Sequence, residues 1–357
     1  MNAGKALLLP FSLLYGLGGW ARNKLFDMRL LPSVSFDIPV VSVGNLSAGG
    51  TGKTPHIEYL IRLLKPYHKG LATLSRGYGR KTQGYLMASG NCSSAEIGDE
   101  PCQFVRKFPE IYVAVDERRV HGIRRLLLET PPAGLVLLDD AYQHRYVKPG
   151  LNILLTDYFQ PYFKDRVLPS GMLREFRSGA RRADIIIVTK CPPVLAPIDR
   201  KNYIRNLKPA AHQRIYFSRI GYGPLQPFFP ENTPPCADIK KVSSILLFAG
   251  IANMYPLEEH IRRCCTYLET MRFPDHHRYT SKEVMEIRER FTNIVGKNKI
   301  LVTTEKDCMR LEDPALAGAI RDLPLYYQPI EVEFFNEDKT WFDKQVLEYA
   351  GKHQTKR

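Results

Sequence analysis

Short apolar runs alternate with helical patterns along most of the chain. β-branched and aliphatic residues dominate the runs at 39–45, 71–77, 111–117, 134–140, 152–157, 184–190 and 214–220. After the first run, Ile57, Leu60, Ile61 and Leu64 recur at the spacing of one face of an amphipathic helix. Strands that alternate with helices are typical of a parallel sheet with crossover helices. The pattern therefore predicts an α/β fold built on a parallel sheet.

The rhythm of strands and helices breaks after residue 222, which indicates a domain boundary. A proline-rich stretch follows at 223–238. The rhythm then resumes as two apolar runs and two helical patterns, at 243–251, 299–307, 257–269 and 281–292. We expect a first domain over residues 1–222 and a second, smaller α/β domain over residues 223–329.

The strand-like residues 325–334 carry the chain out of the expected second domain. They can pair with the run at 214–220, which would make a two-strand hinge between the domains. Residues 330–357 would then pack back on the first domain.

An uncharged stretch occupies residues 6–21, between Lys5 and Arg22. As a helix it would reach about 24 Å, which is shorter than the roughly 30 Å of a hydrocarbon core, and Pro10 interrupts it. Its basic flanks suit a helix that lies in a membrane interface above anionic headgroups. A plain buried helix explains the sequence equally well. A secretory signal peptide is disfavoured because a small-x-small cleavage site is missing.

The amino-acid composition indicates the net charge of the protein and the redox state of its compartment. The 357 residues include 51 Lys and Arg against 37 Asp and Glu, a net charge of +14. Such a field favours an anionic partner, which could be nucleic acid, an acidic membrane or a phosphorylated substrate. The seven cysteines contain no C-x-x-C pair, so a reduced compartment is expected and a zinc or disulfide framework is not.

The sharpest motif is a glycine-rich loop between the run at 39–45 and the first amphipathic helix. Its sequence is Gly49-Gly50-Thr51-Gly52-Lys53-Thr54. Backbone N–H groups of such a loop can surround phosphate oxygens, a lysine can reach the β- and γ-phosphates, and a threonine hydroxyl can ligate Mg²⁺. The strict pattern would place glycine where this chain has Ser47. The order strand, loop, helix nevertheless predicts a phosphate-binding P-loop.

Charged residues at other element ends complement this loop. The run at 134–140 ends in Asp139-Asp140, where P-loop enzymes hold carboxylates against Mg²⁺ or its waters. Arginines cluster at 118–125 and 174–182. Most arginines in such clusters face solvent, and we expect about one from each cluster to contact phosphate.

Further motifs follow one another in order from the N-terminal stretch to about residue 310. They are SVGNLSAGGTGKTP at 42–55, LSRGYGR at 74–80, GDEP at 98–101, LLDDAYQHR at 137–145, MLRE at 172–175, FAGIAN at 248–253, FPDHH at 273–277 and VTTEKD at 302–307. With these motifs the chain resembles the tetraacyldisaccharide 4′-kinase family, enzymes of the lipid A pathway. That family also resembles this chain in having serine at the position of Ser47. Two departures from its pattern are Ala141-Tyr142 for Gly-Phe and Met172 for Pro.

The resemblance implies a kinase that uses ATP and Mg²⁺ to phosphorylate the 4′-hydroxyl of a tetraacyldisaccharide 1-phosphate. It implies that Asp99 is the base, supported by His276, with Lys53 and Arg119 as the other catalytic residues. The implied nucleotide-binding residues are Ser47, Gly49, Gly50, Thr51, Gly52, Lys53, Thr54, Gln143 and His144. The implied residues near the metal are Thr54, Asp139, Asp140 and Glu175.

The resemblance also implies partners and a location. The partners are the acylated disaccharide phosphate lipid and an anionic membrane surface, with neither nucleic acid nor a stable protein partner expected. The location is the cytoplasmic face of the bacterial inner membrane, which residues 1–25 would contact as a peripheral or monotopic anchor.

Two other classes remain as alternatives. The run at 184–190 is similar to the strand and Thr-Lys element of regulatory GTPases, but Pro192 stands where a carboxylate would read guanine. A nucleic-acid-stimulated ATPase would also explain the positive charge, although no aromatic stacking platform stands out.

Overall fold

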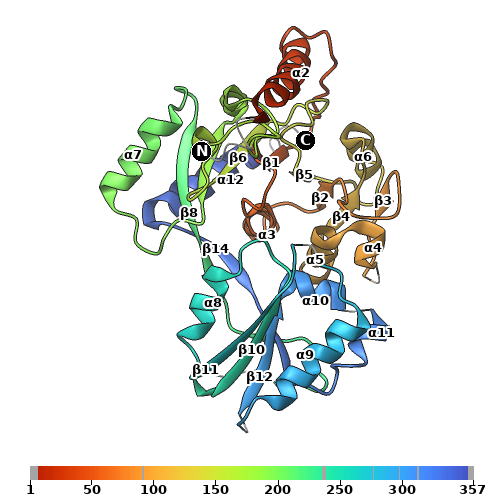
Figure 1. The fold of residues 1–357 in the computed structure, drawn as a ribbon. Helices are drawn as coiled ribbons and strands as arrows, with labels where there is room; N and C mark the ends of the chain where they lie inside the picture. Colours follow the sequence, from red (N-terminus) through yellow and green to blue (C-terminus); the bar gives the residue numbers. More distant parts are fainter. Residues whose placement is uncertain are drawn as a thin grey trace. The chain divides into compact units, whose positions relative to one another are not determined.

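The computed structural model describes residues 7–90, 92–234, 239–275, 277–296, 298–311 and 313–352. Within these ranges the chain forms two compact units (Figure 1). Unit 1 consists of Met1–Cys92, Phe104–Gly221 and Val332–Arg357, and unit 2 consists of Ser93–Gln103 and Tyr222–Glu331. Residues 93–103, which the sequence-based boundary assigned to the first domain, therefore pack with unit 2.

The centre of unit 1 is β1 (Val40–Asn45), which pairs in parallel with β5 (Leu135–Asp139) and β6 (Leu151–Asp157). Every residue of β1 is buried, as expected of a strand covered on both faces. The full order is β14 (Ile330–Phe334), β8 (Arg214–Tyr222), β7 (Ile185–Thr189), β6, β1, β5, β2 (Leu71–Ser75), β4 (Tyr112–Val115) and β3 (Leu86–Met87). The pairs from β4 through β2, β5, β1, β6 and β7 to β8 are parallel, and the short edge pair β3 and β4 is antiparallel.

Alternate residues of these strands pack against helices on opposite faces of the sheet. Leu135 and Leu137 of β5 join the core beneath α3 (Lys53–Leu64) and α12 (Asn336–Gly351). Val136 and Leu138 join the core beneath α6 (Arg119–Leu126). Unit 1 also contains η1 (Tyr162–Lys164), η2 (Arg177–Arg182) and α7 (Pro197–Leu207), besides the N-terminal helix described next. Both faces are therefore covered, and the polar strand ends meet at one edge.

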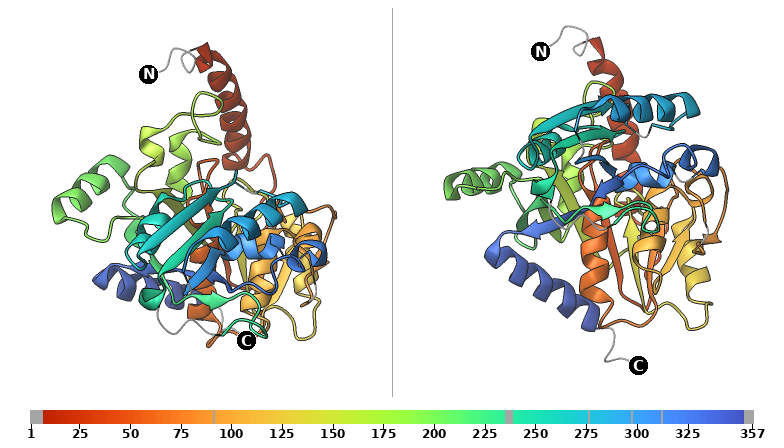
Figure 2. Two further views of the ribbon diagram at one scale, coloured as in Figure 1. Left: turned by 60° about the horizontal axis from the view of Figure 1, so that its bottom comes forward. Right: turned by 90° about the horizontal axis from the view of Figure 1, so that it is seen from below.

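The first helix of the described chain is α2 (Leu9–Asp27), which extends away from the sheet of unit 1 (Figure 2). Only Ser12, Gly16 and Phe26 of this helix are buried. The structure thus differs from the buried-helix interpretation of the N-terminal stretch. None of the helices in the described ranges is both long enough and apolar enough to span a bilayer.

Unit 2 contains a five-stranded sheet of its own. Its order is β11 (Tyr267–Arg272), β10 (Ser244–Ala249), β12 (Lys299–Thr304), β13 (Leu325–Gln328) and β9 (Gln226–Pro227). One face packs against α8 (Tyr255–Arg262), and the other packs against α9 (Ser281–Asn293) and the residues around α10 (Glu305–Leu311) and α11 (Pro314–Ala317). The unit also has η3 (Ile239–Lys241), α4 (Ser94–Ile97) and α5 (Asp99–Lys107), of which α5 ends beyond its boundary.

The predicted α/β class is confirmed, and one predicted helix is wrong. The helical pattern at 257–269 ends at Arg262, and Tyr267–Arg272 is strand β11, which pairs in parallel with all six residues of β10. The tertiary pairing overrides the local periodicity there, because Thr266 and Tyr267 favour an extended backbone. Residues 325–334 form two strands, of which β13 pairs with β12 and β14 lies next to β8.

Candidate active site

The glycine-rich loop connects the end of β1 to the start of α3. Gly52 has a φ of +86° and precedes Lys53, the first residue of the helix. A left-handed backbone of this kind favours glycine, and it lets the loop turn sharply into the helix. The free N–H groups at the start of α3 and the helix dipole make this end suitable for phosphate. A small pocket of about 60 Å³ lies along the loop, and Ser47, Gly49 and Thr51 are among its lining residues.

Side chains from neighbouring strand ends hold the loop in shape. The Asn45 amide donates to the Gly49 carbonyl at 3.1 Å and to the Thr51 hydroxyl at 2.9 Å. The Thr189 hydroxyl donates to the Thr51 carbonyl at 2.9 Å. Lys190 contacts the Gly50 carbonyl and pairs with Asp157 at 2.9 Å. These bonds satisfy the carbonyl groups of Gly49, Gly50 and Thr51 and hold the loop backbone in one conformation.

The expected catalytic lysine lies beside the expected acidic pair. The Lys53 ammonium is 3.6 Å from the Asp140 carboxylate, which Arg174 also contacts at 3.1 Å. Asp139 ends β5 and is buried, and Thr54 is buried in the first turn of α3. The structure therefore brings Lys53 and Asp140 together. Thr54 is the next residue of α3 after Lys53, and Asp139 directly precedes Asp140 at the end of β5.

Arg119 is a buried positive charge of unit 1, and His144 is a neutral imidazole of the same unit. Arg119 is buried, donates to the Asp116 carbonyl at 2.7 Å, and has an Nε with no hydrogen-bond partner among the described residues. Burial lowers the pKa of Arg119 to about 10, against the opposite effect of Asp139 and Asp140. Burial, together with the positive charge of Arg119, lowers the pKa of His144 to about 4. At neutral pH His144 is therefore uncharged.

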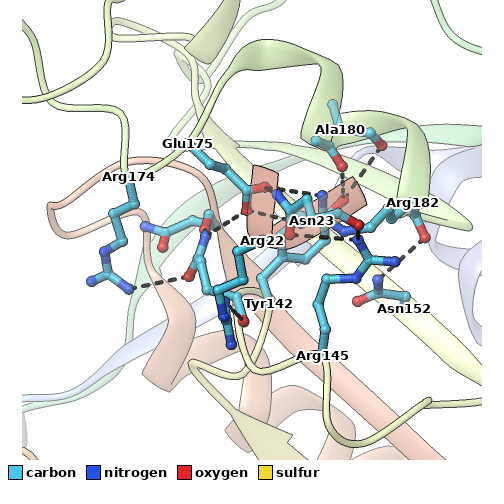
Figure 3. A network of polar contacts seen from close by, with 12 residues as sticks. Arg22, Asn23, Tyr142, Arg145, Asn152, Arg174, Glu175, Ala180 and Arg182 are labelled. Atoms are coloured by element: carbon cyan, nitrogen blue, oxygen red, sulfur yellow. Dashed lines mark hydrogen bonds and ion pairs between the residues drawn. The ribbon is translucent and has the colours of Figure 1, made fainter. Parts of the chain in front are cut away.

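Glu175 belongs to a network of polar contacts (Figure 3), and Gln143 is bonded to it. Gln143 Nε2 donates to the Asn45 carbonyl at 2.8 Å and to Glu175 Oε1 at 3.2 Å. Glu175 is 4% exposed, and Arg182 binds both of its oxygens, at 2.8 and 2.9 Å. Asn23 of α2 donates to Glu175 Oε2 at 2.8 Å. This arrangement gives Glu175 a structural role, and its role beside a metal stays a prediction.

Tyr142 is one of the two departures from the family pattern, and its hydroxyl is used in this network. It donates to the Gly179 carbonyl at 2.8 Å, while the Arg182 guanidinium lies 4.8 Å from the centre of the Tyr142 ring. Phenylalanine would lack this hydrogen bond.

Residues 170–176 run beside the loop, and we call this segment the strap. The Ala48 N–H donates to the Met172 carbonyl at 2.6 Å, and the Arg174 N–H donates to the Leu46 carbonyl at 2.7 Å. Ser47 and Leu173 form an antiparallel bridge between these two bonds. The first half of the phosphate loop is thus paired, backbone to backbone, with the strap.

The expected base, Asp99, belongs to unit 2, where it begins α5. Arg310 of α10 binds Asp99 Oδ2 through Nε at 3.0 Å and through Nη2 at 2.7 Å. Arg310 also donates to Asp307 at 3.0 Å. Burial would lower the pKa of Arg310, but Asp99 and Asp307 outweigh it and raise this pKa. His276 lies outside the described residues.

Several residues of this site were not predicted from the sequence. Asn45 directly follows a buried strand and precedes the loop, so its position alone could have identified it. Asn23 and Arg310 carry no such signal, because they meet Glu175 and Asp99 across 152 and 211 residues of sequence.

Comparisons with known proteins point to one family. The family model for tetraacyldisaccharide-1-P 4′-kinase matches residues 4–349. The tetraacyldisaccharide 4′-kinase of Parabacteroides distasonis is 45% identical over 347 residues, which cover 96% of this chain and 94% of that protein. The enzyme of the same name from Flavobacterium johnsoniae is 44% identical, with 98% of each chain covered.

A solved structure is similar over the whole chain. It is the crystal structure of the "apo" form of LpxK from Aquifex aeolicus in complex with ATP, with a TM-score of 0.73 and 28% identity. The match covers 97% of this chain and 99% of that one. The chain therefore belongs to the tetraacyldisaccharide-1-phosphate 4′-kinase family.

Proposed function

We propose that Lys53, Thr54 and the Asp139-Asp140 pair carry the kinase reaction of this family in unit 1. The observation that supports this assignment is the 3.6 Å contact between Lys53 and Asp140, which joins the phosphate loop to the acidic end of β5. The loop and the start of α3 bind the ATP phosphates. The Lys53 ammonium and the buried Arg119 guanidinium stabilise the charge on the transferred γ-phosphoryl group.

A magnesium ion fits the donors that these elements supply. Thr54 and Asp139 offer oxygen ligands, which a hard cation prefers, and Mg²⁺ usually takes its other ligands from phosphates and water. Within the described ranges, no three His, Cys, Asp or Glu residues cluster as a complete metal cage, and such a shared site does not require one. When bound, the ion would neutralise charge on the β- and γ-phosphates.

Asp99 is proposed as the group that takes the proton of the acceptor hydroxyl. The 4′-oxygen forms a bond to the γ-phosphorus, the bond from phosphorus to the bridging oxygen of ADP breaks, and the hydroxyl proton passes to the Asp99 carboxylate. Arg310 orients this carboxylate through two hydrogen bonds to its Oδ2 oxygen. His276 is proposed as a second group acting with Asp99, on the resemblance alone.

We also propose that α2 holds the enzyme on the anionic membrane that contains its lipid substrate. The helix exposes a series of large apolar side chains, at 76% for Leu7 just before it, 61% for Phe11 and 69% for Leu14. Arg22 and Lys24 follow near its end, and each basic residue near an anionic surface contributes about 1 kcal/mol. This combination suits a helix that lies in the interface rather than across it.

An open pocket of about 390 Å³ lies between α2 and the chain around the strap. Leu9, Leu13, Val167 and Phe176 line it with apolar surface, and Arg177 adds a positive charge at its wall. We propose that it receives part of an acyl chain of the tetraacyldisaccharide, because it adjoins the helix proposed to contact the bilayer.

The assignment is tested by phosphate transfer from labelled ATP to a mono-phosphorylated tetraacyldisaccharide in detergent micelles. We expect Lys53→Ala to reduce kcat by about a thousand-fold, since the reaction depends on electrostatic stabilisation of the phosphoryl group. The matched control is Lys148→Ala, which removes an exposed lysine of the same unit and should keep wild-type turnover. A folded Lys53→Ala enzyme with normal turnover would contradict the assignment.

A further inference from the structure

The inner side of α2 binds the strap at three points along the helix. The Ser12 hydroxyl accepts the Ser170 N–H at 2.9 Å. The Phe176 ring fills the space beside Gly16, where an added Cβ would lie 2.5 Å from the ring. Asn23 then donates to Glu175 Oε2. The helix is therefore attached to residues 170–176 along most of its length.

The other side of the strap is bonded to the phosphate loop, as described above for residues 172–174. One seven-residue segment therefore has α2 on one side and the nucleotide-binding backbone on the other. A displacement of α2 would therefore move the strap, and a displacement of the strap would move Ser47 and Ala48 of the phosphate loop.

A second connection reaches the same loop through side chains. Asn23 contacts Glu175, Glu175 accepts from Gln143, and Gln143 donates to the carbonyl of Asn45. Asn45 is the residue whose amide supports Gly49 and Thr51. Figure 3 shows Asn23 and Arg22 of α2 among these polar contacts.

Two further contacts fix the end of α2 against the chain around Gln143. Arg22 donates to the Gln143 carbonyl at 3.1 Å, and Arg145 donates to the Asn23 carbonyl at 2.7 Å. Glu175 is buried, so its carboxylate depends on the full set of donors around it. Removal of the Asn23 donor leaves Arg182 and Gln143 to satisfy the carboxylate by moving, and movement of Gln143 changes its bond to Asn45.

We propose that Asn23 is a positioning residue for ATP, through which the seating of α2 on the strap sets the shape of the phosphate loop. It acts through Glu175 and Gln143 and does not itself touch nucleotide. The inference rests on the proposed binding of ATP at this loop, but it does not require that α2 contacts a membrane.

The test uses the full chain and measures the Kd of ATP, the KM of the lipid acceptor in micelles and the thermal midpoint. Asn23→Asp is nearly isosteric, but it replaces the Nδ2 donor with an oxygen and places a second carboxylate beside Glu175 Oε2. Asn23→Ala removes the side chain without adding charge. We expect each variant to weaken ATP binding about three- to ten-fold, a larger change than in the KM of the lipid. The matched control is Gly19→Ala on the same helix, where an added Cβ meets nothing within 4 Å.

Wild-type ATP affinity in a folded Asn23→Asp protein would overturn the inference, whatever happens to its thermal midpoint. If both Asn23 variants fail to fold, Ser12→Ala tests the inference instead, because it removes a different contact between α2 and the strap. The inference requires that this variant also binds ATP more weakly than the wild type. Lys53→Ala serves as the reference. If it binds ATP normally, the proposed ATP site is wrong; if it binds weakly while the Asn23 variants bind normally, only the positioning role is wrong.

Discussion

His56 occupies the first turn of α3 and is 3% exposed. Its Nδ1 lies 2.7 Å from the Gly52 carbonyl and its Nε2 lies 3.0 Å from the Ser218 hydroxyl. Because a carbonyl can only accept, Nδ1 carries the proton and Nε2 accepts from Ser218. Burial lowers the pKa of His56 from 6.5 to about 4, against the smaller effect of the Gly52 bond. The ring is therefore neutral in the folded protein.

This burial predicts a loss of stability in acid. Between the unfolded pKa of 6.5 and the folded pKa of about 4, the unfolded chain binds the extra proton, so the free energy of unfolding falls as pH falls. Between about pH 7.5 and about pH 5, the titration of His56 should lower the free energy of unfolding by about 2 kcal/mol. Urea unfolding at both pH values measures this loss of stability. In the His56→Gln variant, the loss between the two pH values should be smaller than in the wild type by the same amount. Equal losses in the two proteins would mean that His56 does not titrate as described.

At the scale of single residues, a site residue could be predicted from the sequence only when the residues that it contacts are close to it in the chain. Gly52, Lys53 and Thr54 were predictable, because strand, loop and helix are consecutive and the loop can only form at their junction. Glu175 was expected near the metal from the family resemblance alone, and its hydrogen bonds to Asn23, Gln143 and Arg182 were not predictable, because Asn23 and Gln143 lie far from it in sequence. A carboxylate motif alone cannot show whether its oxygens are already bound.

At the scale of elements, α2 exposes apolar side chains that a folded chain normally hides. Leu13, Leu14 and Leu17 are 59%, 69% and 52% exposed. Burying one such side chain fully in an apolar medium contributes roughly 1.5 to 3 kcal/mol. Contact with a bilayer would supply that medium.

This helix predicts how the protein binds vesicles. Leu14→Ser combined with Leu17→Ser should weaken binding to vesicles of phosphatidylcholine and phosphatidylglycerol by about ten-fold or more. Flotation of the protein with vesicles measures this change, and pure phosphatidylcholine vesicles report the part due to charge. Val194→Ser, which alters a side chain that is 84% exposed elsewhere in unit 1, is the control. Vesicle binding that survives the double change would assign the membrane contact to another surface.

Element prediction succeeded where a strand is fully buried and failed where local pattern and pairing disagree. The apolar runs that became β1, β5 and β7 are continuous, so no other element fits them. Residues 267–272 instead follow a helix without a turn signal, and only their pairing with β10 makes them a strand. Pairing of that kind is decided by tertiary structure, which periodicity does not contain.

At the scale of the whole molecule, the proposed base and the proposed ATP site belong to different units. Asp99 lies in unit 2 and Lys53 lies in unit 1. We therefore expect Asp99→Asn to lower kcat by about a hundred-fold or more while the Kd of ATP stays within about two-fold. Arg310→Gln should lower kcat in the same direction, and the double variant should be little worse than Asp99→Asn, because residues that act as a unit are not additive. Multiplicative losses would show that Arg310 does not act through Asp99.

The route of the chain through the two units has a consequence for biosynthesis. The core of unit 1 includes Phe342 and Val346 of α12, both at most 1% exposed, and Tyr349 hydrogen-bonds the backbone of Val40. A nascent chain that has left the ribosome as far as residue 331 can complete unit 2, but its central strand β1 still lacks this cover. The phosphate-binding half of the enzyme, although translated first, is thus completed last. A ribosome that stalls before α12 would release a chain with an exposed apolar sheet, which is a substrate for chaperones and proteases.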